Sequence, residues 1–233
     1  MKIVDLSFSY SSSLIFDYFN LNVESKSICS IVGSSGCGKT TLLKLVSGLE
    51  NPLNGEIIKS ENEIGSVSYL FQEPRLLKSQ TAFSNIDIIL KNSIPNTAER
   101  KDRVLYYLDR VGLIDDRAKY PHQLSGGMKQ RVAIARAFAY PSHLILMDEP
   151  MQGLDISSKY DVLTLFKELW DSDPRTTLFV THDLRDALIM GDNVVCLGNP
   201  KGPKLTIDVK DKKLLTDEKI GYYENQILKA ILE

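Results

Sequence analysis

The stretch that decides the fold is Gly33-Ser34-Ser35-Gly36-Cys37-Gly38-Lys39-Thr40-Thr41. A β-prone segment at 27–32 runs into it, and apolar residues at helical spacing follow between 42 and 49. Glycines let backbone N–H groups turn around an anion, and the positive end of the following helix adds to the attraction. We therefore predict a phosphate-binding loop, with Lys39 on the β and γ phosphates and the Thr40 hydroxyl on Mg²⁺. A glycine-rich turn without a ligand is the alternative.

Two adjacent carboxylates end an apolar strand further along the chain. Residues 144–147 read Leu-Ile-Leu-Met, which is typical of a parallel strand covered on both faces, and Asp148 and Glu149 follow directly. Because side chains alternate along a strand, Asp148 can hold Mg²⁺ through water while Glu149 points at the γ-phosphate and orients the attacking water. Alone, such a pair is more often a solvated strand end. Beside a phosphate-binding loop, we favour a role in phosphoryl transfer.

The rest of the chain alternates strands with helices, which predicts an α/β fold. Further strands are expected at 3–8, 19–23, 55–59, 67–71, 178–181 and 194–197. Helices are expected at 97–111, from 127 onward, and at 157–170, 184–190 and 226–232, and the whole stretch 74–139 is mainly helical in character. In the first strand, Val4, Leu6 and Phe8 are expected on one face and Ile3 on the other. The segment 208–221 is predicted to be a charged tail.

Composition excludes several classes of protein. Hydrophobic residues make up 43% of the 233 residues, enough for a packed core, and the formal net charge is −2. A near-neutral chain has no bulk attraction to nucleic acid, so no nucleic-acid partner is expected. No apolar run approaches the ~20 residues that cross a bilayer, so a membrane role would come through a partner. Three scattered cysteines indicate free thiols in a reducing cytosol, and alkylation of Cys37 is expected to block nucleotide.

A second glycine motif carries a resemblance to a known family. Leu124-Ser125-Gly126-Gly127-Met128-Lys129-Gln130-Arg131 resembles the signature motif of ABC ATPases, and it precedes the Asp148-Glu149 strand as it does in that family. The residues themselves indicate an anion site, because Ser125 and two glycines open a helix; a simple helix cap at Ser125 is the alternative. The resemblance implies that Ser125 of one subunit closes on ATP held by residues 33–41 of the other, in a homodimer.

Other motifs follow in the order of the same family. Phe71-Gln72 resembles the Q-loop, Gly153-Leu154-Asp155 the D-loop and Val180-Thr181-His182-Asp183 the switch region. Tyr10 lies where the family stacks an aromatic ring on adenine, although core packing competes with that role. Met128 stands where Gln is frequent in the signature and should be tolerated, and Met151-Gln152 before Gly153 replaces the small residues common in the D-loop.

The resemblance implies a full set of site residues. The implied catalytic residues are Glu149, His182, Gln72 and Lys39. The residues implied to contact the nucleotide are Tyr10, Gly33, Ser34, Ser35, Gly36, Cys37, Gly38, Lys39, Thr40, Thr41, Ser125, Gly126, Gly127 and Asp155. The residues implied to contact Mg²⁺ are Thr40, Gln72 and Asp148, so ATP and Mg²⁺ are the expected ligands.

The resemblance also implies an architecture. The expected fold is a single domain, 1–233, with a RecA-like P-loop NTPase core at 1–73 and 140–233. An N-terminal antiparallel β subdomain belongs to that core, and an α-helical signature subdomain is inserted at 74–139. The segment 73–90 is expected to form a groove that receives a short helix of a membrane partner.

Three functions compete within the family. The first is the ATP-hydrolysing subunit of a membrane transporter, at the cytoplasmic face of the membrane, with separate permease subunits and a solute-binding protein. The second is a soluble ABC ATPase of translation or DNA maintenance, and the third is a regulator without turnover. A single cassette without coiled-coil insertions or basic extensions favours the first. The stretches 71–77, 148–155 and 178–184 resemble import ATPases of the nitrate, sulfonate and taurine group, which favours a bacterial importer.

Overall fold

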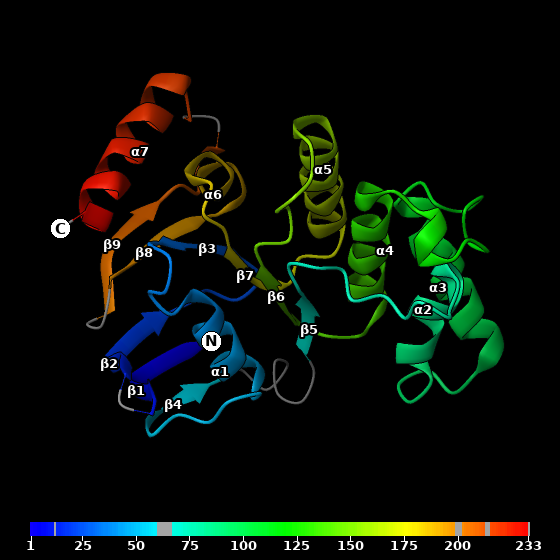
Figure 1. Cartoon of the computed structure of the whole chain (residues 1–233), viewed down its shortest axis with the longest axis horizontal. Helices are drawn as coiled ribbons and strands as arrows, with labels where there is room; N and C mark the ends of the chain where they lie inside the picture. The colour runs from blue at the N-terminus through cyan, green and yellow to red at the C-terminus, as the bar shows by residue number, and fades with distance from the viewer. Residues whose placement is uncertain (12, 60–66, 199–201, 213–214, 233) are drawn as a thin grey trace.

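The computed structural model describes residues 1–11, 13–59, 67–198, 202–212 and 215–232, and they form two sheets flanked by helices (Figure 1). The strands are β1 (Lys2–Tyr10), β2 (Ser13–Asn22), β3 (Ile28–Gly33), β4 (Asn54–Ile58), β5 (Val67–Leu70), β6 (Leu144–Asp148), β7 (Thr176–Val180), β8 (Asn193–Gly198) and β9 (Gly202–Asp208). The helices are α1 (Lys39–Ser47), α2 (Ala82–Leu90), α3 (Thr97–Arg110), α4 (Gly126–Ala139), α5 (Ile156–Ser172), α6 (Leu184–Met190) and α7 (Asp217–Leu232), with a short 3₁₀ helix at Pro121–Gln123. No helix among the described residues is long and apolar enough to cross a membrane.

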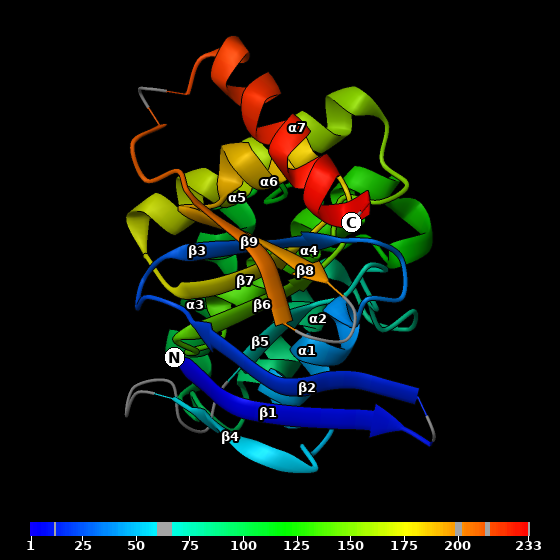
Figure 2. The same ribbon diagram turned by 90° about the vertical axis from the view of Figure 1, so that its left-hand side faces the viewer.

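The larger sheet has the strand order β5-β6-β7-β3-β8-β9 and is parallel except for β9, which runs antiparallel to β8. Its central strands carry apolar side chains on both faces because other elements cover both faces of the sheet. Leu144 and Leu146 of β6 face α1 and the three-stranded sheet, whose order is β2-β1-β4, whereas Ile145 and Met147 face α4 and α5. Figure 2 shows these layers, with α5, α6 and α7 on one side of the larger sheet and β1, β2 and β4 on the other. The carboxyl ends of the parallel strands therefore share one edge, the usual place for a ligand in such sheets.

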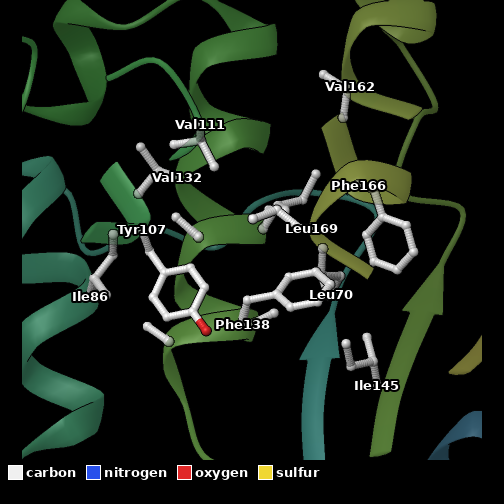
Figure 3. Packing of buried hydrophobic residues seen from close by; sticks show 14 of the residues in the cluster. Leu70, Ile86, Tyr107, Val111, Val132, Phe138, Ile145, Val162, Phe166 and Leu169 are labelled. Carbon is white, nitrogen blue, oxygen red and sulfur yellow. The ribbon is translucent and has the colours of Figure 1, made fainter. Parts of the chain in front are cut away.

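The helices between 82 and 139 are anchored to the core by one apolar cluster (Figure 3). Phe138 of α4 meets Phe166 of α5 edge to face, with 5.5 Å between ring centroids. Leu70 of β5 and Ile145 of β6 lie at the base of the cluster, and Tyr107 of α3 reaches into it from the helical side. The helical stretch expected at 74–139 thus packs through α4 onto the sheet, while its exact boundaries as a subdomain stay a prediction.

The expected alternation in the first strand is wrong. Ile3, Leu6 and Phe8 are all buried, whereas Val4 is only half-buried. The cause is a bulge: the pairing with β2 shifts register between Ile3 and Leu6, and Asp5 has a φ of 48°. Gly55 of β4 lies against this bulge, and a Cβ there would stand 2.3 Å from the Asp5 carbonyl oxygen. The extra residue turns Ile3 to the same face as Leu6.

The carboxyl-terminal part is more regular than expected. The predicted tail at 208–221 begins at the end of β9 and includes the first turn of α7, which starts at Asp217 rather than near 226. Full burial in α7 falls on Ile220 and Ile227, seven residues or two helical turns apart, and Ile220 is the only aliphatic residue in the first two turns. This sparse apolar stripe gives the first turns of α7 little helical periodicity in the sequence.

Candidate nucleotide site

The predicted phosphate loop wraps the amino-terminal end of α1. It joins the end of β3 to Lys39 and lines a cavity of about 400 Å³. Gly38 precedes the helix with a φ of 102°, and a Cβ there would lie 2.7 Å from Ile15 Cγ2 and 2.9 Å from Phe16 Cζ. Only glycine fits this position without displacing those side chains. Because Gly38 has no side chain that could cap α1, the first amide groups of the helix stay available for an anion.

The cavity brings together residues from three loops at the carboxyl edge of the sheet. It is lined by Gly33, Ser35, Gly36, Gly38, Lys39, Thr40, Thr41, Glu149, Gln152 and His182. Nine of these ten were predicted to contact nucleotide or to act on it, and Gln152 was not. Ser34 and Cys37 belong to the loop but do not line the cavity.

Cys37 faces the core instead of the cavity. Its side chain is buried among the apolar residues beneath α1, and burial raises the pKa of its thiol despite the nearby Lys39. A protonated, inaccessible thiol reacts slowly with alkylating reagents. Alkylation of Cys37 should therefore be slow, and that it blocks nucleotide stays a prediction.

Lys39 is already held beside the loop. Its Nζ donates hydrogen bonds to the carbonyl oxygens of Gly33 at 2.9 Å and Ser34 at 3.0 Å, and the residue is 8% exposed. These bonds order a long side chain that would otherwise lose rotamer freedom when a ligand binds. The ammonium group is thus positioned to meet phosphate oxygens.

Asp148 is fixed through both carboxylate oxygens. Thr40 Oγ1 donates to Oδ1 at 3.0 Å, and the Tyr69 hydroxyl donates to Oδ2 at 3.2 Å. Burial raises the pKa of the Asp148 carboxyl, and the two hydrogen bonds oppose that rise. No group of three His, Cys, Asp or Glu side chains among the described residues could hold a metal ion by itself. An oxygen pair such as Thr40 and Asp148 fits Mg²⁺, which takes its other ligands from phosphates and water.

Glu149 and His182 meet at the mouth of the cavity. A hydrogen bond of 3.0 Å joins Glu149 Oε2 and His182 Nδ1, and their side chains are 21% and 61% exposed. Glu149 has a φ of 45°, and its N–H donates to the Val180 carbonyl oxygen of β7 at 3.0 Å. A non-glycine residue in this region carries strain of roughly 1 kcal/mol or more, which is common where a side chain is aimed for function.

Gln72 does not line the cavity itself but is hydrogen-bonded to Gln152, a residue that does. Its Nε2 donates to Oε1 of Gln152, which lines the cavity. Gln152 stands where the family pattern has a small residue, which gives no sign of this contact. Its side chain in this structure links the Q-loop to the segment that precedes the D-loop.

The signature turn lies apart from this cavity. Ser125 Oγ caps α4 by accepting from the Met128 N–H at 3.2 Å, as the simpler reading of Ser125 predicts. A Cβ at Gly127 would lie 3.5 Å from Ser158 Cβ, so the turn packs against the start of α5. Asp155 caps α5 through Ser158, and the bonds from Ser158 lower the pKa of its carboxyl. None of Ser125, Gly126 and Gly127 lines the loop cavity of the same chain.

Tyr10 is not part of the core. It is 40% exposed, its ring and that of Phe8 are nearly perpendicular with 4.8 Å between centroids, and its hydroxyl donates to Glu50 Oε1 at 3.3 Å. The core-packing alternative for Tyr10 is therefore wrong. Its role in stacking on adenine stays a prediction.

An ionic cluster that the sequence did not suggest supports the switch region. Lys159 Nζ of α5 donates to Asp183 Oδ2 at 2.5 Å and lies 2.8 Å from Asp186 Oδ2. Burial raises the pKa of Asp186, whose side chain is 6% exposed. For Asp183, at 37% exposed, burial acts in the same direction, but the bond and charge of Lys159 together with the backbone N–H groups of Arg185 and Asp186 outweigh it, and its pKa is lowered. Asp183 directly follows His182, so these ion pairs connect α5, the helix after the D-loop, to the switch region.

A second hollow, here called the lateral groove, opens between β5, α2 and α4 and has a volume of about 530 Å³. It is lined by Val67, Ser68, Tyr69, Phe71, Arg75, Ile88, Ile89, Asn92, Ala133, Arg136, Ala137 and Tyr140. Arg136 orders one wall by donating to the carbonyl oxygens of Pro74 at 2.8 Å and Arg75 at 3.2 Å. Part of the predicted 73–90 segment thus lines this groove.

Comparisons with known proteins agree with this geometry. The family model described as ABC transporter matches residues 16–152. The aliphatic sulfonates import ATP-binding protein SsuB of Rhodopseudomonas palustris is 34% identical over 97% of this chain and 80% of its own length. The SsuB protein of Escherichia coli strain K12 is 31% identical over 96% of this chain and 88% of its own length.

Solved structures give the same picture. An ATP-binding cassette solved as a dimer in a post-hydrolysis state, with ADP and Pi, has a TM-score of 0.75 and 29% identity, covering 89% of this chain and 98% of its own. The cbiO1 protein of Clostridium perfringens, part of the ABC transporter complex cbiONQ, has a TM-score of 0.83 and 25% identity, covering 99% of this chain and 96% of its own. The expected α/β P-loop architecture is therefore confirmed. Its phosphate loop, Glu149 and His182 line one cavity, and the chain belongs to the ABC transporter family and is an ATP-binding, ATP-hydrolysing cassette.

Proposed function

We propose that this chain is the ATP-hydrolysing subunit of an ABC importer and works as a homodimer with ATP bound between two copies. The observation that carries the proposal is the division of the site: the loop cavity holds one set of groups, while the exposed signature turn lies outside it. A serine-glycine turn at a helix start attracts phosphate as the loop itself does. Each ATP would then be held by Lys39 of one copy and Ser125 of the other.

The proposed reaction is the attack of water on the γ-phosphorus. The new bond forms from the water oxygen, the bond to the β-phosphate oxygen breaks, and Glu149 accepts the proton from water. Lys39 and His182 would hold the γ-phosphate oxygens on which charge accumulates. The hydrogen bond between His182 and Glu149 uses Nδ1 and Oε2, so His182 Nε2 could meet the γ-phosphate while Glu149 Oε1 meets the water.

Mg²⁺ would be held by Thr40 directly and by Asp148 through water, with Gln72 as a further oxygen ligand near the attacking water. When bound, the ion neutralises charge on the β and γ phosphates. The protein contributes by orienting these two oxygen groups, since the Thr40 hydroxyl is already hydrogen-bonded to Asp148 Oδ1 at 3.0 Å.

The transport role rests on the lateral groove and on the relatives. The groove exposes apolar Ile88, 42% exposed, next to Arg75, which stacks over Phe71 at 3.8 Å. A groove lined by apolar side chains and two arginines, Arg75 and Arg136, suits an amphipathic helix. We propose that a permease helix binds there, which would hold the chain at the cytoplasmic face of the membrane, and that a solute-binding protein delivers the solute. The relatives named for aliphatic sulfonate import support the import direction.

Purification from native membranes tests this proposal. A tagged chain should co-purify with its permease subunits, and Ile88→Glu should lose them because a charge enters the apolar groove. Leu228→Glu on α7, where Leu228 is 45% exposed, is the matched control and should retain them. All three proteins should bind ATP equally. Recovery of ribosomes or DNA-repair factors in place of a permease would favour the soluble ABC ATPase.

A further inference from the structure

Tyr69 takes part in two sites at once. Its hydroxyl donates to Asp148 Oδ2 at 3.2 Å, and its ring lines the lateral groove. Neither its position in the apolar segment before Gln72 nor its residue type marked it as part of the nucleotide site. Its partner is 79 residues away along the chain, so the contact exists only after β5 and β6 pair.

The hydrogen bond restricts the carboxylate that faces Thr40. With Thr40 on Oδ1 and Tyr69 on Oδ2, both oxygens of Asp148 have a donor, and the carboxylate plane cannot rotate freely. Groups that hydrogen-bond to a metal-binding carboxylate fix its orientation and raise the affinity of the site for metal. A hydroxyl in this position therefore prepares the oxygen that would face Mg²⁺.

The ring that carries the hydroxyl is itself restrained. Tyr69 and Phe71 stack with 4.2 Å between centroids and an interplanar angle of 19°, and Arg75 lies over Phe71 at 3.8 Å. This stack restrains the ring and so keeps its hydroxyl close to Asp148. Strand β5 positions the Tyr69 ring, the stack with Phe71 restrains it, and the hydroxyl then orients the Asp148 carboxylate.

We propose that Tyr69 is a positioning residue that orients Asp148 for Mg²⁺, an inference that rests on the proposed function. It deepens that function by adding a residue that the metal site and the lateral groove share. A partner that displaces the Tyr69 ring from the groove side would also change the hydroxyl that Asp148 depends on.

The test is a calorimetric titration: Mg²⁺ is added to the full-length chain saturated with a non-hydrolysable ATP analogue, and its affinity is measured. Tyr69→Phe keeps the ring and its stack but removes the hydroxyl, and it should weaken Mg²⁺ affinity about 10-fold, as loss of an outer partner of a metal ligand does. Affinity for the analogue in EDTA should stay unchanged. Tyr140→Phe, which lines the same groove, is the control and should leave both affinities unchanged.

Asp148→Asn separates the inference from the function beneath it. If Asp148→Asn loses Mg²⁺ while Tyr69→Phe retains wild-type Mg²⁺ affinity, the positioning role is overturned and the proposed function stands. If Asp148→Asn also retains wild-type Mg²⁺ affinity, Asp148 has no metal role and the inference about Tyr69 fails with it. A Tyr69→Phe chain that binds the analogue poorly in EDTA would indicate general damage to the site and likewise overturn the positioning role.

Discussion

Replacing Lys159 by Met tests how strongly the switch region depends on a buried ion pair. The substitution keeps the aliphatic length of the side chain and removes the ammonium that pairs with Asp183 at 2.5 Å and Asp186 at 2.8 Å. Asp183 is 37% exposed and can be solvated by water, but Asp186 is 6% exposed and loses its cation. Removing one partner of a buried pair costs about 3–5 kcal/mol. Since water reaches Asp183 and Asp186 can take up a proton, we expect about 3 kcal/mol, the lower end of that range.

Urea unfolding followed by tryptophan fluorescence measures this loss. Trp170 is the only tryptophan and lies on α5, the helix that carries Lys159. A loss of about 3 kcal/mol should also lower the melting temperature by roughly 6–12 °C in a chain of this size. Lys167→Met on the same helix is the control, because its partner Asp171 is 59% exposed. That control should cost at most about 1 kcal/mol.

The pH dependence of the Lys159→Met defect gives an independent check. Burial already raises the pKa of Asp186 in the wild-type chain, and loss of the cation should raise it further. A carboxyl with a higher pKa in the folded state binds more protons there, so the folded state gains stability as the pH falls. The defect should therefore shrink below neutral pH. A Lys159→Met chain as stable as Lys167→Met at pH 7 would refute the view that this cluster holds the switch.

Three further outcomes are expected. Glu149→Gln should retain ATP binding and lose hydrolysis, because the amide cannot accept the proton from water. Nucleotide binding and phosphate release measure the two effects, and hydrolysis at the wild-type rate would show that Glu149 is not the base. Lys39→Ala should weaken ATP binding about 10–100-fold, the value of a charged hydrogen bond, and unchanged affinity in a fluorescent-nucleotide titration would contradict its phosphate contact. Burial lowers the pKa of Lys212 to about 8 from 10.5, so the unfolded chain binds more protons between these values and stability should rise with pH there. Lys212→Met should remove that rise in pH-dependent urea unfolding, and an unchanged slope would count against burial as its cause.

The parts of the site that follow from local spacing could be predicted from the sequence. The phosphate loop needs glycines, a lysine and a hydroxyl within nine residues, and its position between β3 and α1 is a property of one short segment. Most of its residues line the cavity together with Glu149, whereas Ser34, Cys37 and Asp148 do not. Cys37 could not be oriented because the direction of a loop side chain depends on what packs beneath α1.

The contacts that escaped prediction join segments far apart in the chain. Tyr69 meets Asp148 across β5 and β6, and Lys159 reaches Asp186 across α5 and α6, and neither pair leaves a local pattern. The bulge at Asp5 likewise depends on pairing with two neighbouring strands, so an alternation that is regular in the sequence is irregular in the sheet. Residue types suggested what each segment does, but strand pairing decides which side chains meet.

The most direct test of the shared site is the mass of the Glu149→Gln chain in solution with Mg²⁺ and ATP. We expect it to double from the 26.2 kDa of one chain, measured by light scattering, because the uncleaved γ-phosphate keeps two copies together. Adding Ser125→Arg should restore the mass of one chain while ATP remains bound, since the arginine side chain occupies the space that the partner nucleotide needs. A double variant that still dimerises with ATP, or a Glu149→Gln chain that stays a monomer when saturated, would contradict the account.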